Sequence, residues 1–333
     1  MQRKALPYQQ LKKLTHRFVD VRNNGEYEIV CRKFEPILIE LANDLLANSH
    51  KSLYYGNKHK RYLRILASNM ERCSRHGIVR RFKEFLDGLG VEDRLYLLKH
   101  LGEFLIIMAY GRDTYFFSNL DKDLEKNNGK DKTQKDEKHY PYIAYDTVGF
   151  INHVLTLIHE KFGRRKSFVD VGCGIGDKVF LAWLSGIFDE CVGIEYEGFT
   201  SAIGMNVAQG SLSRNRPSIC INKTSIVNKD YSGKNSLIDF GIVNANAFDL
   251  NYRRFDTIYL YQPIANHKLL ITFYEHIFKT MPAKAILLEM LQNSSLKRAV
   301  ENINEESLGH TSYGGRGRYF YKTTTNKLRR KSF

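Results

Sequence analysis

Three closely spaced glycines lie between two apolar segments in residues 167–198, which read SFVDVGCGIGDKVFLAWLSGIFDECVGIEYEG. The segment before the glycines is short and apolar, as expected of a buried strand, and the segment after them has the pattern of an amphipathic helix. A second short apolar segment, Cys191–Ile194, ends on Glu195. The stretch therefore predicts a strand, a tight turn, a helix and a second strand that ends in an acid. That is the opening unit of a nucleotide-binding α/β sheet.

The spacing of the glycines restricts the ligand. Gly172, Gly174 and Gly176 form the pattern G-x-G-x-G, whereas dinucleotide-binding folds use G-x-G-x-x-G. The first two glycines let the backbone turn with positive φ and keep a Cβ out of the ligand's way. Asp170, at the end of the first strand, suits a ligand with an ammonium and a sulfonium rather than one with a pyrophosphate. Glu195 stands where a carboxylate can accept hydrogen bonds from both ribose hydroxyls.

The segment Val169–Asp177 resembles the first motif of the class I S-adenosylmethionine-dependent methyltransferases, and the resemblance covers about residues 140–325. It implies an α/β fold with a Rossmann-like sheet of seven strands, the last one antiparallel, and S-adenosylmethionine as the cofactor. The alternative is a glycine-rich turn in some other α/β protein. The cofactor-binding residues that the resemblance implies here are Asp170, Gly172, Cys173, Gly174, Gly176, Asp177, Glu195 and Tyr196.

A second cofactor contact is expected after the short apolar segment that contains Phe240 and Val243. In the resembled family, an Asp or Asn at this place takes the adenine amino group. The resemblance therefore implies this role for Asn246, with the backbone amide of Ala247 at a ring nitrogen and Phe248 against the adenine face. An Asn carbonyl can accept from an amino group as an Asp carboxylate does. The alternative is an Asn that serves only to form a turn.

The acceptor side is expected after the predicted strand Thr257–Leu260, because ligands bind at the carboxyl edge of such sheets. Three residues follow this strand directly, Tyr261, Gln262 and Pro263. We expect them to orient the acceptor of the methyl group. Amino-directed DNA methyltransferases carry Asp or Asn, two prolines and an aromatic residue here. This chain lacks the second proline and the aromatic, which a flipped base would need for stacking.

The segment before the first strand bears a shorter resemblance. Tyr145-Asp146-Thr147 looks like the corresponding loop of the non-SET histone-lysine methyltransferases. This resemblance implies that Tyr145 and Thr147 lie near the methionine part of the cofactor. The alternative is a helix cap, in which Asp146 or Thr147 accepts from the first amides of the next helix.

Residues 1–118 are expected to form an all-helical domain, whose clearest helices cover 26–48, with Pro36 inside, and 91–108. Residues 119–139 are a charged linker or mobile loop, because they hold too little apolar surface to order themselves. Residues 140–333 form the methyltransferase domain, which Tyr313–Thr323 would close as an antiparallel hairpin.

The chain carries a net charge of +15, which favours polyanionic partners. Lys51–Arg64, where cations and aromatic rings alternate, and Arg75–Lys83 are the candidate contacts; solvated helix faces are the alternative. The five cysteines form no metal-binding pattern, so we expect reduced thiols, no metal and a cytoplasmic or nuclear protein. No apolar run of about 18 residues is present, so we expect no membrane span.

Together these features predict an enzyme that transfers a methyl group from S-adenosylmethionine to a macromolecule, with a protein lysine as the preferred acceptor. The lysine hypothesis rests on the Tyr145–Thr147 resemblance and on the Tyr-Gln-Pro turn. A DNA or RNA methyltransferase is the alternative, favoured by the charge. A non-catalytic binding module that keeps the fold is a third possibility.

Overall fold

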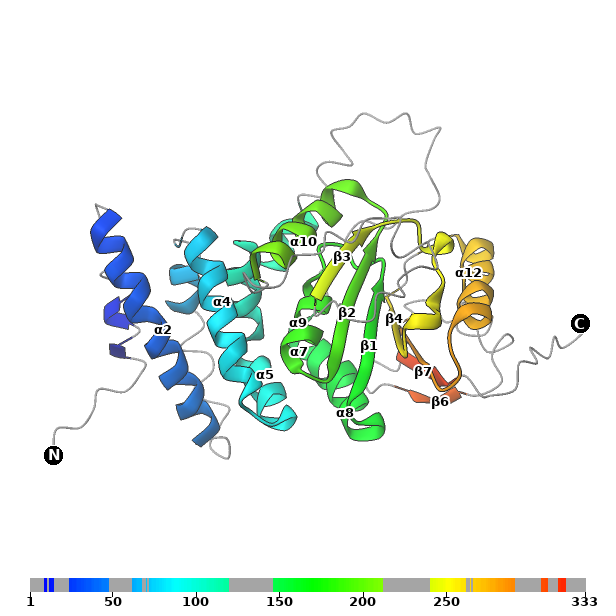
Figure 1. Ribbon diagram of the computed structural model, residues 1–333, viewed down its shortest axis with the longest axis horizontal. Helices are drawn as coiled ribbons and strands as arrows, with labels where there is room; N and C mark the ends of the chain where they lie inside the picture. The colour runs from blue at the N-terminus through cyan, green and yellow to red at the C-terminus, as the bar shows by residue number, and fades with distance from the viewer. Residues whose placement is uncertain are drawn as a thin grey trace, which may run out of the picture.

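The described part of the chain consists of helices that lie beside one open sheet (Figure 1). The structure is a computed structural model, and it describes residues 9–10, 12–14, 24–47, 62–67, 70, 72–119, 146–211, 240–261, 264, 266–290, 307–310 and 317–321. Most of the predicted linker, residues 119–139, therefore lies outside the described residues.

The sheet has seven strands in the order β3-β2-β1-β4-β5-β7-β6. The first five pair in parallel, and β7 is antiparallel to both β5 and β6. The prediction that both strands of the closing hairpin lie within Tyr313–Thr323 is wrong for the first strand. The partner of β7 is β6, which ends before Tyr313. The strands are β1 (Arg165–Val171), β2 (Phe188–Glu195), β3 (Phe240–Asn244), β4 (Thr257–Leu260), β5 (Ile286–Met290), β6 (Ser307–His310) and β7 (Gly317–Tyr321).

Alternate residues of the central strands enter two different cores, as the two-residue period of a strand requires. In β1, Phe168 faces one core while Val169 and Val171 face the other. The first core is covered by α9 (Asp177–Ser185) and α10 (Gly198–Ser211), and the second by α12 (His267–Thr280). Figure 1 shows these helices on opposite faces of the sheet. The sheet is thus buried on both sides, as parallel sheets are.

The N-terminal helices extend the first core rather than enclosing one of their own. They are α2 (Asn24–Ala47), α4 (Arg72–Asp87) and α5 (Val91–Tyr110), so the two helices expected at 26–48 and 91–108 are confirmed. Buried residues of all three helices form one continuous cluster with α9 and the sheet. Gly102 of α5 lies so close to Leu181 of α9 that an added Cβ would come within 3.3 Å of it. Whether residues 1–118 fold as a domain of their own stays a prediction.

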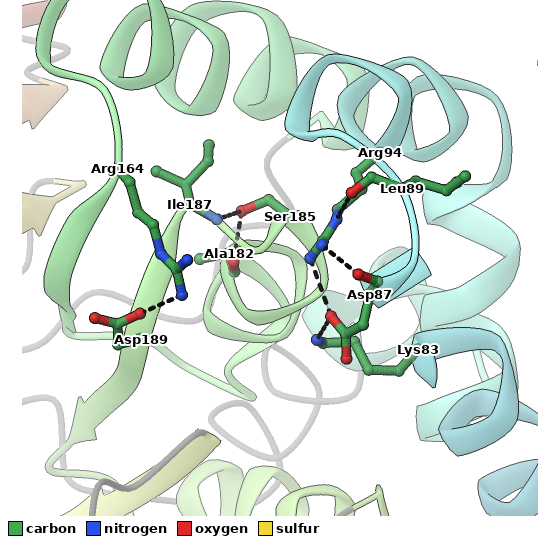
Figure 2. Close-up of polar contacts among 9 residues, drawn as sticks. All are labelled: Lys83, Asp87, Leu89, Arg94, Arg164, Ala182, Ser185, Ile187 and Asp189. Atoms are coloured by element: carbon green, nitrogen blue, oxygen red, sulfur yellow. Dashed lines mark hydrogen bonds and ion pairs between the residues drawn. The ribbon is translucent and has the colours of Figure 1, made fainter. Parts of the chain in front are cut away.

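Arg94 joins the turn between α4 and α5 to the end of α9 (Figure 2). Its guanidinium donates to the carboxylate and the carbonyl of Asp87, at 3.0 Å each, and to the carbonyl of Leu89 at 3.0 Å. It also covers Gly186, the residue with left-handed φ that ends α9, where an added Cβ would overlap the guanidinium. This arginine therefore packs the turn between α4 and α5 against the C-terminal end of α9.

Within the described residues, no helix is long and apolar enough to cross a membrane. The same part of the chain holds no group of three His, Cys, Asp or Glu side chains that could bind a metal ion.

Candidate active site

The glycine loop leaves the carboxyl end of β1 and leads into α9. Gly172, Gly174 and Gly176 have φ of 74°, 55° and 81°, so all three adopt the left-handed conformation that glycine tolerates best. At Gly176 the space is also limited, because an added Cβ would lie 2.4 Å from Ile242 Cδ1. The loop therefore requires glycine both for its backbone turn and for its close packing.

The buried side of the loop is held by the second strand. The amides of Gly172 and Cys173 both donate to the carbonyl of Ile194, at 2.8 and 3.0 Å. The Cys173 side chain is buried, and burial, together with the nearby carboxylates of Asp170 and Glu195, raises the pKa of its thiol. Cys173 is therefore a protonated packing residue at neutral pH, not a reactive thiolate.

Asp170 lies at the loop with its side chain 3% exposed. Burial, and then the neighbouring carboxylate of Asp177, raises the pKa of Asp170 well above 3.8, against the attraction of Lys178. In the described part of the chain no hydrogen bond reaches its carboxylate. Burying such a group without a partner is costly. A ligand ammonium would supply the missing partner, as expected from the sequence.

Glu195, at the end of β2, is held in place by backbone amides. Its Oε2 accepts from the amide of Gly174 at 2.7 Å, and its Oε1 accepts from the amide of Glu197 at 2.9 Å. Burial raises the pKa of Glu195 above its usual value, and these backbone hydrogen bonds oppose that shift only in part. Because each carboxylate oxygen can accept more than one hydrogen bond, both retain capacity for ribose hydroxyls.

Asn244, at the end of β3, supports this acid from behind. Its side-chain amide donates to the carbonyls of Glu195 and Tyr196 at 3.1 and 2.9 Å. Asn244 was not predicted as part of the site, because an Asn at a strand end gives no local signal of the strand beside it.

Asp177 and Lys178, at the start of α9, form an ion pair although both are buried. The resemblance implied a cofactor contact for Asp177, and the structure places its carboxylate under the loop with Lys178. Tyr110, the last residue of α5, reaches the same place, since its hydroxyl oxygen is 3.7 Å from the position of an added Gly176 Cβ. Neither Lys178 nor Tyr110 carries a local pattern that would predict its place in this cluster.

The residues predicted to contact the adenine follow β3, whose last residue pairs with Glu195. Asn246 starts a short 3-10 helix, Ala247–Asp249, and its side-chain oxygen accepts from the amide of Phe248 at 3.1 Å. The turn role that the sequence left open is thus present, and the adenine role stays a prediction. The Phe248 ring lies 5.0 Å from that of Phe273, and Tyr196 is 59% exposed next to Glu195.

The segment before β1 is a helix in three parts, α7 (Thr147–Phe150), the π-helical η3 (Ile151–Leu155) and α8 (Thr156–Phe162). Asp146 caps it by accepting from the amides of Val148 and Gly149 at 3.3 and 2.9 Å, as one of the two alternatives proposed. Thr147 is buried, and its methyl group packs against Gly102 of α5. Its predicted place near the methionine part remains untested, and Tyr145 lies outside the described residues.

On the acceptor side, Tyr261 follows β4 directly and is partly exposed, with its ring against the first core. Gln262 and Pro263 lie outside the described residues, so their roles in orienting the acceptor stay predictions.

The structure describes only part of the two segments that were expected to contact a polyanion, Lys51–Arg64 and Arg75–Lys83. Residues 51–61 lie outside the described residues, and Arg64 is paired with Glu103. Arg81 is paired with Glu35, and Lys83 with Asp87 at 2.5 Å. These three cations are engaged by acids of the chain itself, which supports a structural role for them.

The residues of the loop fit S-adenosylmethionine. Asp170 offers a buried carboxylate of the charge that its ammonium needs, and Glu195 offers a carboxylate that backbone amides hold in place, as its ribose hydroxyls need. The sheet expected of the resembled family has seven strands with the last one antiparallel, and the observed sheet has that arrangement. The chain has the fold of a class I S-adenosylmethionine-dependent methyltransferase.

No protein-family model matches the chain, and no curated protein matches its sequence. Among solved structures, it is similar to an S-adenosylmethionine-dependent methyltransferase from Clostridium acetobutylicum, with 11% identity over 51% of this chain and 59% of that one, at a TM-score of 0.33. A ribosomal protein L11 methylase from Lactobacillus delbrueckii matches with 12% identity over 54% and 80%, at a TM-score of 0.33. A mutant of MtNAS in complex with S-adenosylmethionine matches with 10% identity over 81% and 99%, at a TM-score of 0.35.

This chain thus spans less than two thirds of the Clostridium protein. Similarities this distant do not assign an activity to this chain.

Proposed function

We propose that the protein transfers a methyl group from S-adenosylmethionine to a macromolecular acceptor, and that this acceptor is a protein side chain, lysine in particular. The main support for this cofactor is the buried carboxylate of Asp170, which no hydrogen bond reaches within the described residues. It lies beside the glycine loop, whose Gly174 amide holds Glu195 in place.

Each residue of the site has a distinct part in this proposal. Asp170 binds the ammonium of the cofactor, and Glu195 binds the ribose, with Asn244 holding the peptide of Glu195 in place. When bound, S-adenosylmethionine supplies the electrophilic methyl group and its leaving group, so the protein contributes mainly position. Placing two reactants together can remove about 7–11 kcal/mol of a barrier. Tyr261 and the following Gln262 and Pro263 orient the acceptor at the same edge of the sheet.

The preference for protein over nucleic acid rests on the sequence after β4, where the stacking aromatic of base-modifying enzymes is missing. The engagement of Arg64, Arg81 and Lys83 by internal acids also weakens the case for a phosphate-binding surface on these helices. The net charge of +15 is the observation that favours the second candidate, a DNA or RNA methyltransferase.

The test is transfer of label from methyl-tritiated S-adenosylmethionine into a cell extract, which is afterwards divided between nuclease and protease treatment. We expect label that survives nuclease and is released by protease, and loss of this label in Gln262→Ala. Label released by nuclease would overturn the protein acceptor in favour of DNA or RNA.

If nucleic acid is the acceptor, its binding should weaken steeply with salt, by about 0.9 in the log–log slope for each phosphate contact. Absence of label in every fraction, with the cofactor bound normally, would overturn the macromolecular acceptor and leave a narrow or small-molecule acceptor. Weak or absent cofactor binding would instead favour the non-catalytic module.

A further inference from the structure

The hydroxyl of Tyr110 is a buried polar group that the proposed mechanism does not yet use. Its ring is partly exposed, but the oxygen itself is buried, and it has no hydrogen-bond partner among the described residues. Leaving such a donor without an acceptor costs about 1–3 kcal/mol, and most buried polar groups avoid this cost. The orphan hydroxyl therefore needs a partner.

The position of this hydroxyl is fixed by the packing of α5. The Tyr110 ring meets Phe180 of α9 edge-on, with centroids 6.0 Å apart and planes at 89°, and it lies 6.3 Å from the ring of Phe117. Gly111, in the left-handed conformation, ends α5 directly after it and donates to Ile107 at 2.7 Å. Rings and helix end together hold the hydroxyl against the glycine loop, next to Gly176.

The electrostatics of the cluster keep the phenol protonated. Burial, and then the carboxylate of Asp177, raises the pKa of Tyr110 well above 10. The group is therefore a hydrogen-bond donor at any physiological pH. It stands at the acidic end of the site, where Asp170 and Asp177 are both buried.

We propose that Tyr110 donates a hydrogen bond to the carboxylate of bound S-adenosylmethionine, so that the helical part of the chain completes the cofactor site. This inference rests on the proposed function. The cofactor brings one charged acceptor, its carboxylate, into a region that already holds the buried carboxylates of Asp170 and Asp177 and the buried ammonium of Lys178, which is paired with Asp177. A neutral donor at this place gives the cofactor carboxylate a hydrogen bond and leaves the acid that binds the ammonium unchanged.

The test compares two ligands and two variants of the full chain by calorimetric titration. Tyr110→Phe removes the hydroxyl and keeps the ring against Phe180. 5′-Methylthioadenosine keeps the adenosine and a methyl group on sulfur, but its sulfur is an uncharged thioether and it lacks the whole amino-acid chain, carboxylate and ammonium together. We expect Tyr110→Phe to weaken S-adenosylmethionine binding about tenfold or more, the usual effect of losing a hydrogen bond to a charged group, and to leave methylthioadenosine binding within about twofold.

Tyr96→Phe is the matched control, because it removes a hydroxyl from the same helix about 21 Å away and should leave both affinities unchanged. Equal binding of S-adenosylmethionine by wild type and Tyr110→Phe would overturn the inference while the proposed function stands. An equal loss for both ligands would also overturn it, since the hydroxyl would then support the loop rather than the carboxylate. If the wild-type chain itself bound no S-adenosylmethionine, the proposed function would fail first.

Discussion

Asp170 shows at the scale of one residue how a binding site reduces the stability of a fold. Its folded-state pKa is raised above 3.8, so the folded chain holds this proton more tightly than the unfolded chain does. With Asp170 protonated in both states, below pH 3.8, the free energy of unfolding has its full value. It falls as the pH rises from there through the folded-state pKa of Asp170. At every pH above the unfolded-state value of 3.8, this raised pKa makes the group destabilise the cofactor-free protein.

We therefore expect Asp170→Asn to stabilise the cofactor-free protein at neutral pH by about 1–3 kcal/mol, the range for a buried group without its partner. The gain should shrink as the pH falls, because the wild-type carboxyl group becomes protonated. The same variant should bind S-adenosylmethionine more weakly. Thermal unfolding at several pH values, with and without the cofactor, measures both effects. A variant that is less stable than wild type at neutral pH would contradict this account of Asp170.

At the scale of elements, α10 approaches the glycine loop so closely that one of its positions must be glycine. A Cβ added to Gly204 would lie 2.6 Å from the carbonyl oxygen of Ile175, which is backbone of the loop and cannot move alone. It would also lie 2.9 Å from Ile242 Cγ1. Position 204 therefore has no room for a larger side chain unless the helix or the loop moves.

We expect Gly204→Ala to destabilise the protein by about 1–3 kcal/mol, as overpacking of a core does, and to weaken cofactor binding by shifting the loop. Gly198→Ala is the matched control in the same helix, because nothing lies within 4 Å of its added Cβ. Urea unfolding and a cofactor titration on both variants provide the measurement. If the two variants behaved alike, the close approach of α10 would not matter for the loop.

Local patterns in the sequence predicted the elements that have a clear period or a strong turn signal. The strand before Gly172, the helix after Gly176 and the acid at Glu195 are examples, and α2 and α5 followed from their apolar spacing. The contacts of Tyr110, Lys178 and Asn244 could not be predicted in this way. Each depends on which element lies beside it in space, and a single sequence carries no signal of that packing. The first strand of the closing hairpin was predicted too late in the chain. The two glycines at 314–315 indicated a tight turn with a strand directly before it, whereas β6 ends several residues earlier.

At the scale of the whole molecule, the helices and the sheet share one core. The cluster that includes Phe34 of α2 and Leu105 of α5 also includes Phe180 of α9 and Phe168 of β1. Trp183, the single tryptophan of the chain, lies at this junction, stacked 5.4 Å from Phe240 and with the ammonium of Lys83 5.2 Å from its ring. It therefore reports on contacts between the two parts.

We expect tryptophan fluorescence and far-ultraviolet circular dichroism to follow one coincident unfolding transition, because the shared core couples the helices to the sheet. Chemical unfolding monitored by both signals tests this. Two separate transitions would instead indicate that residues 1–118 unfold as an independent domain.

The most direct test of the central claim is a calorimetric titration of the purified full chain with S-adenosylmethionine. We expect saturable binding at one site, and weaker binding in Asp170→Asn because the ammonium of the cofactor loses its partner. A wild-type protein that unfolds cooperatively but binds no S-adenosylmethionine would contradict the assignment of the glycine loop as a cofactor site.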